Sequence, residues 1–252
     1  MISMINNKSI KRYYTVDSTN KVAFDLANNS KLSHQWVVAD IQTNGKGRHG
    51  RSWDSPLGGL YISRIISDIT DYKSVSNLGF VASLALYSTI NSSITNVEFR
   101  SKIKLKWPND ILIDNLKLGG ILIETKIINS KTVIVIGFGL NVFEVNGLNL
   151  EANKAYLTNY ATELKISNLY IYLINSFNNW FCKWDYGNNF NHILESWLSK
   201  TCGIGENIQV KTSNEVILGT FLGLNNDGSL LIKENNKKRI INSGEIIINN
   251  EK

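Results

Sequence analysis

The sequence is poor in the residues that build metal centres and disulfide frameworks. It contains two cysteines, three histidines and two prolines in 252 residues. Cys182 and Cys202 have no metal-ligand spacing, and the histidines form neither a triad nor a metal pattern. The composition therefore argues against a zinc module and a disulfide scaffold, and it is typical of a protein from the reducing cytoplasm.

Long apolar runs are also missing. No run approaches the ~20 residues needed to span a bilayer. The N-terminal stretch MISMINNKSIKRYY lacks the apolar core of a signal peptide. Hydrophobic residues make up 43% of the chain, and the mean hydropathy is -0.12. We therefore expect a globular, cytoplasmic protein with no membrane partner.

Acidic residues are in modest deficit. The chain has 27 Lys and Arg residues against 21 Asp and Glu residues, which gives a net charge of +6. An excess of this size suits a nucleic-acid-binding protein, an enzyme that handles ATP, or a protein that acts on an acidic carrier. Charge alone leaves these three classes open.

Hydrophobic patterning predicts an α+β domain followed by a small all-β unit. Helical spacing is found at 20–28, 75–90, 168–184 and 189–199, and strand signals at 36–41, 60–66, 103–107, 110–113, 118–125 and 132–138. From Gly203 onward the pattern changes to short strands, at 207–212, 215–224, 229–233 and 239–248. We therefore divide the chain into residues 1–202 and 203–252, and we expect the second unit to be a small barrel with a hairpin turn at Asn226-Asp227-Gly228.

The stretch GKGRHG, residues 45–50, has the G-x-G-x-x-G spacing of a dinucleotide-binding turn. Such a turn requires a helix that opens on its last glycine, whereas residues 51–59 lead into a strand. The pattern instead favours an anion-binding loop, because glycine N–H groups can approach an anion closely and Lys46, Arg48 and Arg51 add positive charge. Trp53 adds a flat apolar surface. The alternative to an anion-binding loop is a solvated basic turn without a ligand. The glycines at alternate positions argue against this alternative.

Four further clusters carry candidate functional residues: DSTN at 17–20, KWPND at 106–110, KLGGILIE at 117–124 and GFGLN at 137–141. Each also has an ordinary structural explanation. The first would cap a helix, the second would form a tight turn, and the glycines would allow strands or a ligand to approach closely. Any one of these clusters alone is a weak signal.

In this order, the five motifs resemble those of the biotin protein ligases. The family pattern is D-S-T-N, G-R-G-R-x-G-R-x-W, K-W-P-N-D, K-[LI]-[AG]-G-[IV]-L-[IV]-E and G-[IL]-G-[IL]-N, and the matching segments span residues 17–141. Gly244-Glu245-Ile246 resembles a recurring segment of the family's C-terminal domain. Lys46 stands where the family has Arg, which keeps the charge but loses the planar fork. Because the pattern starts at residue 17, we expect the ligase-only form, without an N-terminal DNA-binding domain and without DNA as a partner.

The resemblance implies an α+β fold. Its catalytic domain would have a mixed sheet of the biotin/lipoate protein ligase type with helices on one side, and its C-terminal domain would be a small SH3-like β-barrel. ATP and biotin would be the substrates, Mg²⁺ the cofactor, and a biotin carboxyl carrier protein the partner of a monomer or homodimer. Biotin and ATP would form biotinyl-5′-AMP, from which biotin passes to a lysine of the carrier.

The resemblance also implies roles for individual residues. The biotin-binding residues would be Ser18, Thr19, Asn20, Gln42, Lys46, Gly47, Arg48, Lys117 and Gly120. The ATP-binding residues would be Arg48, Arg51, Trp53, Lys117 and Asn141. The catalytic residues would be Lys46, Arg48, Lys106, Asp110 and Lys117. Asp110 would hold Mg²⁺ or help to deprotonate the incoming lysine, and segment 142–148 would cover the adenine.

Two alternatives remain. A lipoate or octanoate protein ligase has a similar fold and adenylate chemistry, but its Arg-Arg and Ser-Gly-Gly-Gly signatures are missing from this sequence. A basic nucleic-acid-binding protein would need aromatic residues interleaved with Lys and Arg on the C-terminal strands. That segment holds one aromatic residue, Phe221, which disfavours this class.

Overall fold

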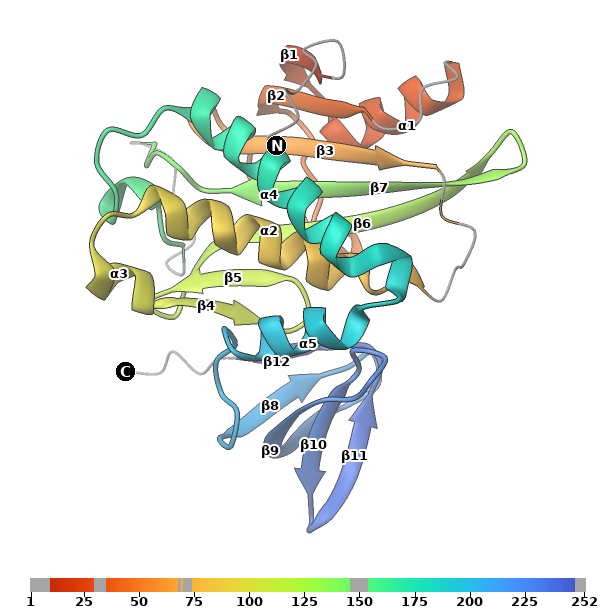
Figure 1. Cartoon of the computed structure of the whole chain (residues 1–252), viewed down its shortest axis with the longest axis vertical. Helices are drawn as coiled ribbons and strands as arrows, with labels where there is room; N and C mark the ends of the chain where they lie inside the picture. The colour runs from red at the N-terminus through yellow and green to blue at the C-terminus, as the bar shows by residue number, and fades with distance from the viewer. Residues whose placement is uncertain (1–9, 30–34, 68, 70–73, 146–153, 248–252) are drawn as a thin grey trace.

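The computed structural model describes residues 10–29, 35–67, 69, 74–145 and 154–247. Seven strands form a mixed sheet in the order β1-β2-β3-β7-β6-β5-β4 (Figure 1). The strands are β1 (Ile10–Val16), β2 (Trp36–Gln42), β3 (Leu60–Ile66), β4 (Ile103–Lys106), β5 (Asp110–Ile113), β6 (Leu116–Ile128) and β7 (Lys131–Leu140). β1 runs parallel to β2, and the other neighbouring pairs are antiparallel.

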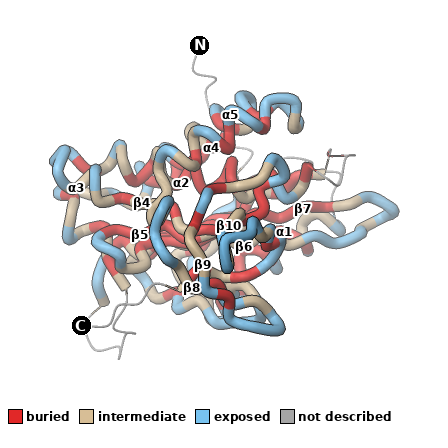
Figure 2. Tube along the Cα trace, turned by 90° about the horizontal axis from the view of Figure 1, so that it is seen from below, coloured by how far each residue is buried: buried red, intermediate tan, exposed pale blue. Residues whose placement is uncertain are grey.

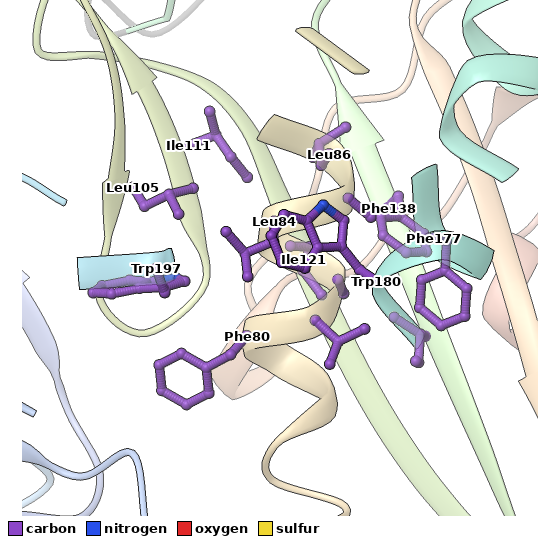
Figure 3. Close-up of a cluster of buried hydrophobic side chains, with 14 of the residues drawn as sticks. Phe80, Leu84, Leu86, Leu105, Ile111, Ile121, Phe138, Phe177, Trp180 and Trp197 are labelled. Atoms are coloured by element: carbon purple, nitrogen blue, oxygen red, sulfur yellow. The ribbon is translucent and has the colours of Figure 1, made fainter. Parts of the chain in front are cut away.

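One face of this sheet is covered by two long helices, α2 (Leu78–Ser93) and α4 (Ile166–Trp184) (Figure 1). Strand alternation directs Trp36 and Phe138 towards these helices, where both rings pack against Phe177 of α4, with centroid distances of 5.4 and 6.0 Å. Figure 3 shows part of this cluster. α3 (Val97–Ser101) and α5 (Phe190–Leu198) extend the same layer at its edge.

The opposite face is covered in part by α1 (Thr19–Asn29). Ala23 and Phe24 of this helix form a second buried cluster with alternate strand residues, namely Val37, Ile65, Val133 and Val135. The expectation of helices on one side therefore holds for α2 and α4, while α1 lies on the other face. α1 contacts β2, β3, β7 and β6, and Asn20 in its first turn lies beside Ser63 of β3 and Glu124 of β6.

Residues 203–247 contain a second, antiparallel sheet in the order β11-β10-β9-β8-β12. Its strands are β8 (Asn207–Lys211), β9 (Val216–Leu224), β10 (Leu230–Glu234), β11 (Lys237–Ile241) and β12 (Glu245–Ile247). Within the described residues β11 and β12 do not pair, so the sheet is not closed into a barrel, although its SH3-like character fits the expectation. The single strand predicted at 239–248 is divided into β11 and β12 by a bend at 242–244.

The second sheet is docked against the first domain beside the KWPND turn. Nε1 of Trp107 donates a hydrogen bond of 3.1 Å to the carbonyl of Gly228, which lies in the predicted hairpin turn between β9 and β10. Thr201 donates a 2.8 Å hydrogen bond to the carbonyl of Leu105 in β4. Buried residues concentrate in the first sheet and in α2 and α4, and the hairpin tip between β6 and β7 is exposed (Figure 2). None of the helices in the described part of the chain combines the length and apolar character needed to cross a membrane.

Candidate active site

A pocket of about 640 Å³ lies on the sheet face that α1 leaves open. Strand register brings its floor together. Asp110 pairs with Gly120, and Gly120 pairs with Gly139, so that one row crosses β5, β6 and β7. In the next row Gly137 lies between Leu122 and Ser63. The three glycines leave the floor without side chains of its own, which lets side chains from other elements lie close to the strand backbone.

All the predicted site residues except Lys46 line this pocket. They are Ser18, Thr19, Asn20, Gln42, Gly47, Arg48, Arg51, Trp53, Lys106, Asp110, Lys117, Gly120 and Asn141. Lys46 is exposed, and its backbone forms a bridge with Ser52 that leaves its side chain outside the pocket. The structure therefore does not bring Lys46 together with the other predicted residues.

One end of the pocket is a polar wall at the N-terminus of α1. The backbone N–H of Thr19 donates a 2.8 Å hydrogen bond to Oε1 of Gln42, and Nε2 of Gln42 donates one of 2.8 Å to Ser55. Ser55 in turn donates to the carbonyl of Trp53 at 2.9 Å. The Gln42 amide is thus held in one orientation, with its oxygen towards α1.

Three residues outside the predicted set support this wall. Oγ of Ser63 lies 2.6 Å from Oδ1 of Asn20 and 2.7 Å from Oγ1 of Thr19. Nδ2 of Asn20 donates a 2.7 Å hydrogen bond to Glu124. A side chain at Gly137 would place its Cβ 2.5 Å from Oδ1 of Asn20, so the glycine makes room for this amide. Glu124 belongs to the quoted motif KLGGILIE, but that motif gave no sign of its partner.

The other end of the pocket is cationic and surrounds the buried carboxylate of Asp110. Nζ of Lys117 lies 2.8 Å from Oδ1 of Asp110, and Nζ of Lys106 lies 3.9 Å from Oδ2. Nζ of Lys117 also lies 5.3 Å from the centre of the Trp53 ring. This arrangement holds two ammonium groups ready for an anion, because a more highly charged ligand can replace the single carboxylate as their partner.

The glycine loop is a closed turn rather than the start of a long helix. The N–H of Gly47 donates a 2.7 Å hydrogen bond to the carbonyl of Arg51, and the N–H of Trp53 donates one of 2.9 Å to Gly45. His49 within it has a left-handed φ of 57°. The loop thus adopts the non-Rossmann geometry that the sequence predicted.

Both arginines of the loop contact β12 or the residue before it. Nη1 of Arg48 donates to the carbonyl of Gly244 at 3.1 Å, and burial lowers the pKa of this guanidinium. Arg51 makes a bidentate contact with Glu245, at 3.3 and 2.7 Å. Burial acts to raise the pKa of Glu245, but the hydrogen bond and charge of Arg51 outweigh it, and the pKa is lowered. Glu245 lines the pocket, so the C-terminal sheet contributes to the site.

The far side of the pocket is formed by Trp53 and the end of β7. The Trp53 ring lies against the backbone of Gly139, where an added Cβ would lie 2.6 Å from the ring. Nδ2 of Asn141 donates to the carbonyl of Lys117 at 3.3 Å. Asp54 and Lys154 form an ion pair of 2.7 Å that also lines the pocket, and neither residue was predicted. Of segment 142–148, residues 146–148 lie outside the described part of the chain.

Family models and known proteins place the chain among its relatives. Residues 13–141 match the model described as the biotin/lipoate A/B protein ligase family, and residues 203–248 match the biotin protein ligase C terminal domain. The chain is 31% identical over 238 residues to the bifunctional ligase/repressor BirA of Bacillus spizizenii, covering 92% of this chain and 71% of that protein. It is 28% identical over 239 residues to the biotin–[acetyl-CoA-carboxylase] ligase of Paracoccus denitrificans, covering 91% and 96%.

The fold is similar to that of the biotin protein ligase from Aquifex aeolicus in complex with biotin and ATP. The TM-score is 0.79 at 23% sequence identity, and the match covers 95% of this chain and 98% of that one. The first family model alone spans just over half of the chain, and the C-terminal model covers the second sheet. On this evidence the chain belongs to the biotin protein ligase family.

Proposed function

We propose that the protein is an ATP-dependent biotin protein ligase, which activates biotin as biotinyl-5′-AMP and transfers it to a lysine of a biotin carboxyl carrier domain. One observation carries this proposal. A single pocket joins a polar wall, built from Thr19, Asn20 and Gln42, to a cationic end that holds Arg48 and Lys117. A ligand with a polar ring at one end and a carboxylate at the other matches this division.

In the first step the biotin carboxylate attacks the α-phosphate of ATP and pyrophosphate leaves. The approach brings two anions together, so positive groups that are already in place lower the barrier. Arg48 is partly buried and donates a hydrogen bond to Gly244 of the C-terminal unit, and Lys117 lines the same pocket beside Trp53. We assign these two residues to the carboxylate and the developing adenylate phosphate, with Arg51 and Lys106 at the leaving phosphates.

In the second step a carrier lysine attacks the mixed anhydride as a neutral amine, forms an amide bond and displaces AMP. Asp110 is paired with two of the pocket lysines, Lys106 and Lys117, and its side chain is 7% exposed. We assign it the role of accepting a hydrogen bond from the incoming amine, which orients the nitrogen lone pair towards the carbonyl. Trp53 and Asn141 are assigned to the nucleotide side.

Of the pocket residues that the proposal uses, Asp110 is the carboxylate that could serve as a ligand for Mg²⁺. Mg²⁺ in nucleotide sites is commonly held by one or two carboxylates together with phosphate oxygens. Asp110 is a buried carboxylate of this kind, but its Oδ1 is paired with Nζ of Lys117 at 2.8 Å, so Mg²⁺ would have to share or replace that ammonium group. In the described part of the chain no group of three His, Cys, Asp or Glu residues could hold a metal, so phosphate oxygens of ATP and water would complete the coordination. When bound, the ion would neutralise charge on the phosphate oxygens.

The proposal is tested by mass spectrometry of adenylates formed by the purified protein from Mg-ATP with either biotin or lipoate. Biotinyl-AMP alone is the expected product. Lipoyl-AMP would move the protein to the lipoate ligases, and no adenylate from either acid would refute the ligase function. The carrier, the need for Mg²⁺, a monomeric or homodimeric state, the cytoplasmic location, the absence of DNA binding and the domain boundary at 202/203 all stay predictions.

A further inference from the structure

A chain of hydrogen bonds runs behind the polar wall and starts at Glu124. Nδ2 of Asn20 donates to Oε2 of Glu124 at 2.7 Å, and Oδ1 of Asn20 lies 2.6 Å from Oγ of Ser63. Ser63 in turn lies 2.7 Å from Oγ1 of Thr19, which lines the pocket. Asn20, Ser63 and Thr19 are at most 5% exposed, so water cannot easily replace any member of the chain.

The carboxylate of Glu124 determines which group donates and which accepts at each step of this hydrogen-bond chain. A carboxylate can only accept hydrogen bonds, so the amide nitrogen of Asn20 must face Glu124 and the amide oxygen must face Ser63. That oxygen can also only accept, which draws the single hydroxyl hydrogen of Ser63 towards Asn20. The hydroxyl of Thr19 lies 2.7 Å from Oγ of Ser63 and 3.1 Å from Oε1 of Gln42, so it must give its own single hydrogen to one of these two oxygens. Because that hydrogen is used within the wall, Oγ1 of Thr19, a pocket-lining residue, can offer a ligand only an acceptor.

Packing prevents the chain from rearranging freely. Gly137 leaves the Asn20 amide just enough room, since an added Cβ would lie 2.5 Å from Oδ1 and 3.1 Å from Nδ2. Gln42 cannot supply a compensating donor, because its oxygen accepts from the N–H of Thr19 and its nitrogen is used by Ser55. Whether the wall offers donors or acceptors therefore depends on the orientation of the Asn20 amide, and the hydrogen bond to Glu124 fixes that orientation.

We propose that Glu124 is a positioning residue that determines ligand specificity by turning the polar wall into a set of hydrogen-bond acceptors. This inference rests on the proposed function. The ureido ring of biotin carries two N–H donors, which acceptors in the wall would bind. The dithiolane ring of lipoate has no donor, so it would leave the same buried acceptors unpaired, and sites that use hydrogen bonds discriminate strongly on this basis. Glu124 itself does not line the pocket and acts through Asn20.

Two substitutions at Glu124 separate this role from simple packing. In Glu124→Met the hydrogen-bond chain loses its terminal acceptor, so the Asn20 amide can turn its nitrogen towards Ser63. The wall then presents donors as well as acceptors to the N–H groups of biotin. Biotin should therefore bind about ten- to a hundredfold more weakly. In Glu124→Gln the side-chain oxygen can still accept from Asn20, so biotin affinity should stay within about threefold of wild type. Lys126→Met is the matched control. Lys126 is the next residue on the same face of β6, and it packs over Phe24 of α1 at 4.4 Å, outside the hydrogen-bond chain.

The experiment is calorimetric titration of the three full-length variants with biotin, lipoate and ATP, together with thermal unfolding. The expected pattern is a loss in Glu124→Met that affects biotin alone, is rescued in Glu124→Gln, and is absent in Lys126→Met. Equal losses for biotin, lipoate and ATP would overturn the inference, as would biotin binding by Glu124→Met at wild-type strength. If the unmodified protein bound no biotin, the proposed function would fall as well, so the two failures are distinguishable.

Discussion

Replacing Gly139 with alanine tests whether Trp53 forms a wall of the pocket. The added Cβ would lie 2.6 Å from Cε2, 2.7 Å from Nε1 and 2.8 Å from Cζ2 of the indole. Carbon atoms in contact normally lie about 3.5–4.0 Å apart, so the ring and the backbone must separate by roughly 1 Å. The clash involves the flat face that Trp53 presents to the site.

The ring should move rather than the strand. Gly139 lies within β7, which is paired with β3 on one side and β6 on the other, whereas Trp53 is half-buried on a loop. Overpacking of this kind costs about 1–3 kcal/mol. If the loop moves and carries the Trp53 ring away, the unfolding free energy changes little. The cost then falls on the binding free energy, because a ligand needs the Trp53 ring in its original position. We therefore expect ATP affinity to fall by about five- to 150-fold in Gly139→Ala.

The assay is calorimetric titration with ATP alongside urea unfolding, and a glycine outside the pocket serves as the control. A Cβ at Gly79 in the first turn of α2 would have its nearest contact at 3.8 Å, so Gly79→Ala should leave ATP affinity unchanged and raise the unfolding free energy by at most about 1 kcal/mol. Wild-type ATP affinity in Gly139→Ala would refute the role assigned to Trp53.

Three further outcomes follow from the contacts. Arg51→Ala should lower the unfolding free energy by less than about 1 kcal/mol at neutral pH, since the pair with Glu245 is partly exposed. The pKa of Glu245 is lowered in the folded protein, so this contribution is present above the carboxyl's ordinary pKa of 4.5 and disappears as pH falls through the folded value. Urea unfolding at pH 7 and pH 3 tests this. If Arg51→Ala differed equally from wild type at both pH values, the prediction would be contradicted. Phe177→Ala should cost about 3–5 kcal/mol in the same assay, and a loss below about 1 kcal/mol would show that the cluster around it collapses. Arg48→Gly should release biotinyl-AMP and biotinylate lysines indiscriminately, which filter binding of the adenylate would detect; a variant that retains adenylate as tightly as wild type would rule out this role.

Much of the fold follows from hydrophobic patterning, and the exceptions have physical causes. The strands predicted at 60–66 and 110–113 match β3 and β5, and the helix predicted at 168–184 matches α4, Ile166–Trp184. β1 was missed because IKRYYTV is an edge strand with mostly exposed side chains and no alternation. The placement of α1 on the face opposite α2 was not predictable, because amphipathic spacing shows that a helix is half-buried without showing which sheet face it covers.

The site was predictable as a set of motifs, but its supporting contacts were not. Arg51 and Glu245 are 194 residues apart, and Asp54 and Lys154 are 100 residues apart. No local pattern connects positions at such distances. Glu245 did carry a signal, since Gly244-Glu245-Ile246 resembles a family segment, whereas nothing in the sequence marked Asp54, Lys154 or Ser63.

The structure also explains why the motifs are informative together and weak alone. The two glycines of GFGLN are needed because of side chains from two other motifs. Gly137 makes room for Asn20 of DSTN, and Gly139 makes room for the ring of Trp53, which follows the glycine loop. Gly120 pairs with Asp110 of KWPND on one side and with Gly139 on the other. Each motif therefore supplies either a side chain or the space that another motif's side chain occupies. A chain with one motif intact and its neighbours replaced would keep a turn or a strand but would lose the pocket, because glycine without its partner leaves a gap and the partner without glycine collides with the sheet.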